Sequence, residues 1–191
     1  MISLVAGGKI VINKREAARY AGVRGDLAEI KPLLDSCEKE LLSAITPRAC
    51  YDIFDIVRGQ SLDLGFAKVD SRALGRNLEG CDKIALFAAT IGAGADRLIM
   101  KYQKISPSRA LILDALASAA AESWCDEVNK IITSQFSESR PRFSCGYGDL
   151  PLSLQSDIFA ALQVTKLLGV TLSDDYFMTP VKTVTAIIGV K

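Results

Sequence analysis

The residue types best suited to bind a small molecule lie in one short stretch, residues 142–151, which reads RFSCGYGDLP. Its two glycines and its proline disfavour regular structure, and glycine lets a ligand approach the main chain closely. Arg142 can donate paired hydrogen bonds to a carboxylate or phosphate, and Tyr147 adds an aromatic ring. Because ordered loops that carry such groups are common sites of function, we expect this stretch to hold one small anionic or zwitterionic molecule.

Histidine is absent from the sequence. This excludes Ser-His and Cys-His nucleophilic pairs and imidazole metal ligands, and it removes the commonest general base near neutral pH. Any chemistry would rest on carboxylates, tyrosine, lysine, or a group supplied by a cofactor or partner. We therefore assign no catalytic residue and no metal ligand.

The cysteines are odd in number and widely spaced, with no C-x-x-C pair: Cys37, Cys50, Cys81, Cys125 and Cys145. This pattern argues against a disulfide framework and against a thiolate zinc site. We expect four of them to be small buried residues. Cys145 lies in the glycine-containing stretch, where a reactive thiol is the less favoured alternative because no neighbouring residue supplies a base.

The chain has 191 residues, 49% of them hydrophobic and 24% charged, with a formal net charge of +1. This composition is typical of a folded protein with one large domain or two small ones, and it lacks the basic face expected of a nucleic-acid-binding protein. The apolar runs are far shorter than the ~20 residues that span a bilayer, and the N-terminus does not resemble a signal peptide. We expect a cytoplasmic protein that binds neither nucleic acid nor membrane.

Hydrophobic periodicity and turn residues predict helices gathered around a few strands. The predicted helices are a short one capped by Asn13, one over about 27–45 interrupted by Pro32, 71–78, about 95–104, a long one opened by Ser106 and Pro107, and 153–168 capped by Ser153. The predicted strands cover 49–57, 62–69, 83–90 and 181–190. Because strands and helices do not alternate regularly, the predicted class is α+β.

Two further features of the sequence have a plain and a functional interpretation. The turn at residues 91–94 (IGAG) joins a strand to a helix, as in anion sites, but it matches no phosphate-binding signature and is more simply a tight connection. Glu122 lies on the long helix, which is apolar on both sides and is therefore expected to be largely buried. It is either half of a structural salt bridge or a ligand for an ammonium or sulfonium group.

Three motifs carry a resemblance to a known family: R-x-x-x-G-Y-G-D-x-P over 142–151, L-G-V-T-L over 168–172, and M-x-P-x-K-x-V-x-A over 178–186. They resemble the activation domain of vitamin B12 (cobalamin)-dependent methionine synthase, which reads roughly R-P-x-P-G-Y-x-x-x-P-D, I-G-V-x-L-T-E-S and M-x-P-x-x-S-V-S-G. Weaker matches at 13–22, 89–92 and 113–118 resemble free-standing bacterial relatives of that domain. The similarity covers nearly the whole chain.

The resemblance implies an antiparallel or mixed sheet packed with helices, forming one domain over 1–191. Within that domain, residues 1 to about 70 would form an N-terminal part of helices and strands, and residues from about 71 to 191 would form a ligand-binding core. It also implies an S-adenosylmethionine site. In the family, the arginine holds the methionine carboxylate, backbone near the glycine contacts the nucleoside, and a helix carboxylate holds the amino group. By position, the site residues are Arg142, Ser144, Gly146, Tyr147 and Glu122.

The family's corrinoid carriers use a histidine of a D-x-H-x-x-G motif as a cobalt ligand, which this chain cannot supply. The resemblance therefore implies an accessory protein for methionine biosynthesis, and whether it is itself an enzyme stays open. It would bind S-adenosylmethionine and support reductive methylation, or reactivation, of cob(II)alamin on a separate cobalamin-dependent methionine synthase, a methyltransferase. Cobalamin would be carried by that partner, and a flavodoxin-like or other electron donor would assist.

Three alternatives stay open. The chain could serve a different corrinoid protein in the same way, or it could be a non-catalytic docking or ligand-sensing module with the same fold. A self-contained S-adenosylmethionine methyltransferase is less favoured, because the Rossmann strand-loop-helix signature is absent.

Overall fold

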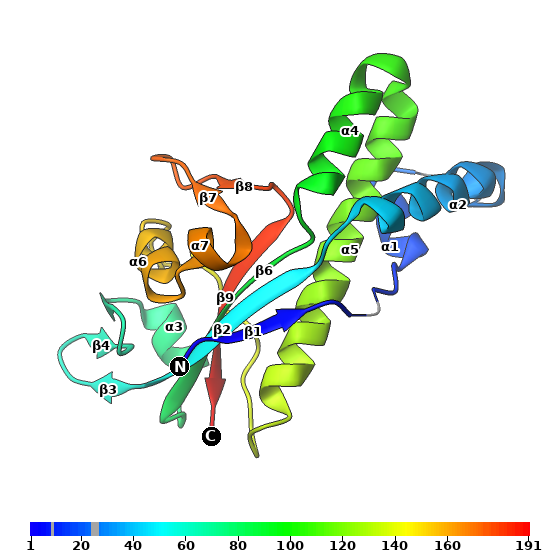
Figure 1. Ribbon diagram of the computed structural model, residues 1–191. Helices are drawn as coiled ribbons and strands as arrows, with labels where there is room; N and C mark the ends of the chain where they lie inside the picture. The colour runs from blue at the N-terminus through cyan, green and yellow to red at the C-terminus, as the bar shows by residue number, and fades with distance from the viewer. Residues whose placement is uncertain (9, 24–26) are drawn as a thin grey trace.

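A four-stranded antiparallel sheet forms the centre of the molecule in the computed structural model, which describes residues 1–8, 10–23 and 27–191 (Figure 1). Its strands follow the order β1 (Ser3–Ala6), β2 (Arg48–Asp55), β6 (Lys83–Thr90) and β9 (Thr183–Val190). Strand β6 pairs along its full length with β2 on one side and with β9 on the other. This central position explains why every residue of β6 after Lys83 is buried.

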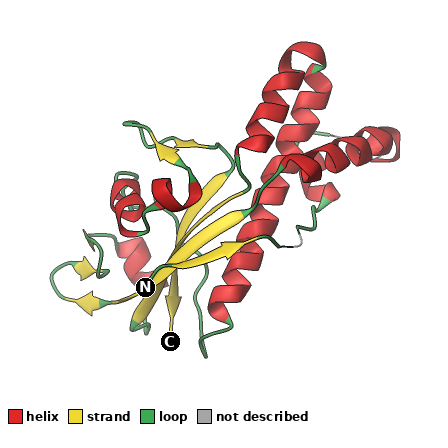
Figure 2. Cartoon of the chain, in the orientation of Figure 1, coloured by secondary structure: helices red, strands yellow, loops and turns green. Residues whose placement is uncertain are grey.

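Helices cover both faces of this sheet (Figures 1 and 2). One face packs against α1 (Lys14–Tyr20), α2 (Leu27–Ala44), α4 (Ala93–Ile105) and α5 (Pro107–Thr133). The other face packs against α3 (Arg72–Asn77), α6 (Leu154–Ala161) and α7 (Val164–Leu168). Alternate residues of β6 enter the two cores, as the two-residue period of a strand requires: Ala85, Phe87 and Ala89 on the first face, and Ile84, Leu86 and Ala88 on the second.

The long helix α5 is the main element of the first core. Its single tryptophan, Trp124, is fully buried and donates a hydrogen bond from Nε1 to the Arg48 carbonyl at 3.1 Å. The helix therefore meets the start of β2 through both packing and a polar contact. Its small residues let the helix lie close to the sheet, which confirms the prediction of a largely buried helix.

Two small sheets complete the structure. The first joins β3 (Val57–Arg58), β4 (Leu62–Asp63) and β5 (Lys68–Val69), and the second joins β7 (Thr171–Leu172) and β8 (Met178–Thr179). The predicted single strand over 62–69 was wrong. The chain reverses at Gly65, whose φ is +79° and whose N–H donates to the Asp63 side chain, so that two short strands replace one.

The predicted helix over 153–168 was also wrong as one piece. It is divided into α6 and α7 by Gln163, whose φ of +49° is incompatible with a continuous right-handed helix. Pro32, predicted to interrupt the second helix, lies inside α2. Ser106 and Ser153 occupy helix N-cap positions but make no side-chain capping bond, whereas Asn13 and Ser71 do.

The α+β class with an antiparallel sheet packed by helices is confirmed, and the strand over 83–90 has the predicted limits. Strand β1 was not predicted. No helix among the described residues is long and apolar enough to cross a membrane.

Candidate functional site

The loop over residues 142–151 is held along the edge strand of the central sheet. Phe143 and Ile187 of β9 exchange two backbone hydrogen bonds of 2.8 Å. The next residue, Ser144, donates its hydroxyl to the Thr185 carbonyl at 2.9 Å. The stretch predicted from sequence as an irregular loop is therefore irregular but firmly attached to β9.

The glycines give this loop a compact turn. Gly146 and Gly148 have φ angles of +83° and +58°, which are strained for other residues. The N–H of Gly146 donates to the Leu150 carbonyl at 2.9 Å, and the N–H of Tyr147 donates to the Ser144 carbonyl at 3.2 Å. These two amides belong to the backbone that the resemblance places against the nucleoside, and both are engaged inside the loop.

Asp149 fixes the far end of the loop to helix α3. Its carboxylate accepts hydrogen bonds from the Ser71 hydroxyl and from the N–H groups of Arg72 and Ala73. The hydroxyl, followed by the Ala73 and Arg72 amides, holds the pKa of this carboxyl at about 2. The sequence motif drew attention to this residue only as part of the resemblance, and its capping role was missed.

Arg142 lies between two acidic residues of α5. Its Nη2 is 2.9 Å from Asp126 Oδ1 and 3.4 Å from Glu122 Oε2. Glu122 and Asp126 are four residues apart and so share a face of the helix. Glu122 forms the structural salt bridge that was one of its two predicted roles, but its side chain is 50% exposed rather than buried. Asp126 was missed because only its position opposite Arg142 reveals it.

The guanidinium of Arg142 retains unused donors. Its side chain is 26% exposed, and its Nη1 atom is buried without a hydrogen-bond partner. An unpaired buried donor is unfavourable. The buried Nη1 is closed to a ligand, so a ligand oxygen would meet the exposed part of the side chain instead.

Tyr147 presents its ring at the mouth of the site. It is 73% exposed and meets the Phe143 ring edge-on, with ring centres 6.0 Å apart. This contact orients the tyrosine without covering it, so one aromatic surface stays open for a planar ligand group.

These side chains enclose a pocket of about 470 Å³ lined by Glu122, Arg142, Phe143, Ser144, Tyr147 and Val184. Four of the five sequence-predicted site residues line it, and Gly146 does not. Phe143 and Val184 were missed, because the contact between the loop and β9 has no signature in the local sequence.

A second pocket of about 440 Å³ adjoins the first and shares Glu122 and Val184 with it. Its polar centre is Lys182, whose Nζ lies 2.9 Å from both Asp114 Oδ1 and Ser118 Oγ. The two pockets thus meet at Glu122 and Val184, between α5 and the start of β9.

A reactive thiol and a metal site are less well supported than the binding of a small molecule. Burial raises the pKa of the Cys145 thiol to about 11, which keeps it neutral and weakly nucleophilic at pH 7. The other four cysteines are buried, as predicted. Within the described ranges, no cluster of three or more Cys, Asp or Glu is arranged to hold a metal ion.

The glycine turn at 91–94 serves packing. A Cβ at Gly92 would meet the Thr46 side chain and backbone, and one at Gly94 would overlap the Ala44 carbonyl. The end of α2 thus lies against the start of α4, and the glycines are explained by this close approach rather than by an anion.

Comparison with known proteins supports the fold. No family model matches the chain, and a search of curated proteins finds no match. Among solved structures, the chain is similar to the MetH reactivation domain crystallised with AdoHcy, with a TM-score of 0.72 and 15% sequence identity. The similarity covers 100% of this chain and 78% of that one. The chain therefore has the fold of that reactivation domain, in agreement with the resemblance predicted from its motifs.

Proposed function

We propose that the pocket beside Arg142 binds S-adenosylmethionine. The observation that carries this proposal is that Glu122, Arg142, Ser144 and Tyr147, all chosen at the level of sequence, line a single pocket. The chain also has the fold of a domain that was crystallised with AdoHcy. In the proposed complex, Arg142 holds the ligand carboxylate, Glu122 holds its ammonium group, and Tyr147 lies against the adenine.

The charges around the pocket fit this ligand. Glu122, Asp126 and Arg142 together carry a net charge of −1, whereas S-adenosylmethionine carries +1 because of its sulfonium. The ligand carboxylate can bind the exposed part of the Arg142 side chain while the ligand ammonium replaces the long 3.4 Å contact to Glu122. Binding would thus exchange one weak ion pair for two, and the charges of the three side chains and the ligand would sum to zero.

We further propose that the chain acts on a separate corrinoid protein, with cobalamin-dependent methionine synthase as the first candidate. The bound S-adenosylmethionine would supply the methyl group, and an outside electron donor would supply one electron to cob(II)alamin. The protein's own residues would bind and orient the methyl donor. We also propose, as expected from the sequence, that the protein is cytoplasmic and that its N-terminal part and its ligand-binding core divide near residue 70.

Calorimetric titration tests the ligand assignment. Wild type is expected to bind S-adenosylmethionine, and Arg142→Ala is expected to lose at least about tenfold in affinity, since a charge-assisted contact is removed. Arg97→Ala, on the exposed face of α4, is the matched control and should bind as wild type does. Glu122→Gln provides a second variant if Arg142→Ala unfolds. Equal heats for all four proteins, or no heat for any, would reject the site.

A reactivation assay tests the role in trans. Cob(II)alamin on a purified methionine synthase, mixed with a reductant and S-adenosylmethionine, is expected to convert to methylcobalamin faster when the chain is added. Arg142→Ala should not accelerate it. Acceleration only with another corrinoid protein would favour the alternative partner.

The non-catalytic alternative rests on one observation, the neutralisation of Arg142 by Glu122 and Asp126. Ligand binding that leaves every corrinoid protein unaffected would support a ligand-sensing module instead.

A further inference from the structure

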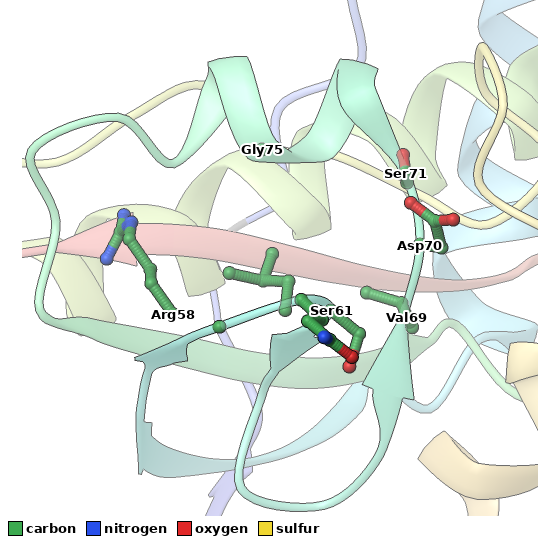
Figure 3. A pocket seen from close by; sticks show the side chains of 9 residues that line it. Arg58, Ser61, Val69, Asp70, Ser71 and Gly75 are labelled. Carbon is green, nitrogen blue, oxygen red and sulfur yellow. The ribbon is translucent and has the colours of Figure 1, made fainter.

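Two adjoining pockets lie between α3 and the small sheet of β3, β4 and β5, and they share no lining residue with the pocket beside Arg142. Figure 3 shows the smaller of the two. The larger measures about 610 Å³ and is lined by Arg58, Arg72, Gly75, Arg76 and Glu79. The smaller pocket measures about 240 Å³ and is lined by both polar and apolar residues, which include Ser61, Leu62 and Val69. Both pockets use Arg58 and Gly75, so a ligand could extend from one into the other.

Arg58 is held in a fixed position at the junction. Its Nη1 donates to the Cys81 carbonyl at 2.9 Å and its Nη2 to the Leu78 carbonyl at 2.7 Å. Because a guanidinium has five N–H donors, three stay free after these two bonds. Figure 3 shows the side chain rising from β3 toward α3. Arg58 is thus an immobilised cation with spare donors.

Arg72 and Arg76 add two further cations. They lie four residues apart on α3 and therefore on one face of it. Within the described part of the chain, neither guanidinium has a hydrogen bond or an ion pair. Asp70 and Glu79 are the acidic residues in the two walls, which leaves a net positive charge and two unpaired arginines around the larger pocket.

Gly75 is the observation that points to a ligand. Glycine inside a helix is unfavourable relative to alanine, so its presence usually has a packing or backbone reason. Here neither applies: a Cβ at Gly75 would meet nothing within 4 Å, and its φ is not positive. By contrast, a Cβ at Gly94 would overlap the backbone of Ala44. Gly75 instead leaves the surface of α3 open where both pockets meet.

We propose that this cleft binds an organic phosphate. The phosphate would lie in the larger pocket against Arg72, Arg76 and Arg58, because guanidinium groups match the oxygens of a phosphate with paired donors. The rest of the molecule would cross Gly75, where no side chain blocks it, into the smaller pocket. There the apolar surfaces of Leu62 and Val69 and the hydroxyl of Ser61 would contact it.

Titration with inorganic phosphate and with AMP tests the proposal, in a buffer free of other oxyanions. Calorimetry gives the affinities, and amide chemical shifts show where each probe binds. Both probes are expected to shift the amides of residues 58 and 72–76, and AMP is expected to bind more tightly because it also reaches the smaller pocket. Failure of both probes to bind, or shifts confined to other regions, would overturn the proposal. Equal affinities would overturn the contribution of the smaller pocket.

Four variants distinguish binding in this cleft from a general effect of surface charge. The double variant Arg72→Ala/Arg76→Ala is expected to lose at least about tenfold in phosphate affinity, whereas Arg97→Ala should bind as wild type does.

Gly75→Ala should raise the Tm by roughly 2–4 °C and yet weaken AMP binding, which a purely structural glycine would not do. Arg142→Ala should leave phosphate binding unchanged, so the two ligand proposals can fail independently. Unchanged phosphate affinity in the double variant, or unchanged AMP affinity in Gly75→Ala, would contradict the proposed geometry.

Discussion

At the scale of single residues, Asp126 decides how the charge of the proposed methyl donor is recognised. It makes the shorter of the two contacts to Arg142, at 2.9 Å, yet no motif identifies it. In the proposed complex, Asp126 would compete with the ligand carboxylate for the guanidinium and would also attract the sulfonium. A product without the sulfonium charge, such as AdoHcy, would experience only the competition.

We therefore predict that Asp126→Asn lowers the preference for S-adenosylmethionine over AdoHcy. Because the pair is half-exposed, we expect a change of up to about fivefold in the affinity ratio. Competition calorimetry with the two ligands measures it. Glu127→Gln is the control, since Glu127 pairs with Lys130, at 3.8 Å, and not with Arg142 among the described contacts. An unchanged affinity ratio in Asp126→Asn would show that Asp126 does not contribute to the preference for S-adenosylmethionine.

Asp149 determines the acid stability of the loop. Its carboxyl has a pKa of about 2 in the folded protein, below its ordinary value of 3.8. A lowered pKa stabilises the fold fully above the ordinary value, and this stabilisation is lost as the pH falls from about 4 towards 2.

Accordingly, Asp149→Ala should lower the Tm by several degrees at pH 6, and the difference from wild type should shrink below pH 4. Thermal melts followed by circular dichroism at a series of pH values provide the measurement. Asp174→Ala, at an exposed position in the described structure, should change little at any pH. A difference that persists unchanged at pH 2 would show that the hydrogen bonds do not depend on the carboxylate charge.

At the scale of elements, the sequence predicted the helices and strands whose formation depends on neighbouring residues. The apolar run at 83–90 and the long helix after Pro107 were predicted well, because burial of a whole segment leaves a continuous signal. The break between α6 and α7 was not predicted, since the residue in the left-handed conformation, Gln163, is neither glycine nor proline and so gives no local signal. The division of 62–69 depends on one glycine turn inside an apolar run.

The same distinction applies to the site. Arg142, Ser144 and Tyr147 belong to one loop, so a short motif could identify them. Glu122 was placed by resemblance. Asp126 and Val184 come from α5 and β9, and only the folded structure brings them to the loop. Contacts between distant segments have no local signature that a single sequence could reveal.

The junction of α2 and α4 provides a prediction at this scale. A Cβ at Gly94 would overlap the Ala44 carbonyl oxygen, so Gly94→Ala forces the two helices apart. We expect it to reduce the free energy of unfolding by about 1–3 kcal/mol. Urea denaturation measures this loss, with Gly75→Ala as the control of opposite sign. A Gly94→Ala variant as stable as wild type would show that the helices can separate at no cost.

At the scale of the whole molecule, the central sheet unites the two predicted parts of the chain. Strands β1 and β2 precede residue 70, whereas β6 and β9 follow it, and β6 pairs with both β2 and β9. We predict that urea unfolds the chain in one transition. Fluorescence of the buried Trp124 and far-ultraviolet circular dichroism should give the same midpoint. Separate midpoints would indicate that the part before residue 70 unfolds independently.

Because the proposed ligand pocket is built from α5, the loop and β9, it exists only when these parts of the molecule are folded together. A ligand that binds there should therefore stabilise the whole fold. At a free concentration of 100 times its Kd, S-adenosylmethionine should add about 2.7 kcal/mol, which corresponds to a rise in Tm of roughly 5–11 °C for a protein of this size. Differential scanning fluorimetry measures the shift across a ligand series. At the same ligand concentrations, Arg97→Ala should shift as wild type does and Arg142→Ala should shift far less. If Arg142→Ala shifts as much as wild type, the ligand stabilises the fold from another site.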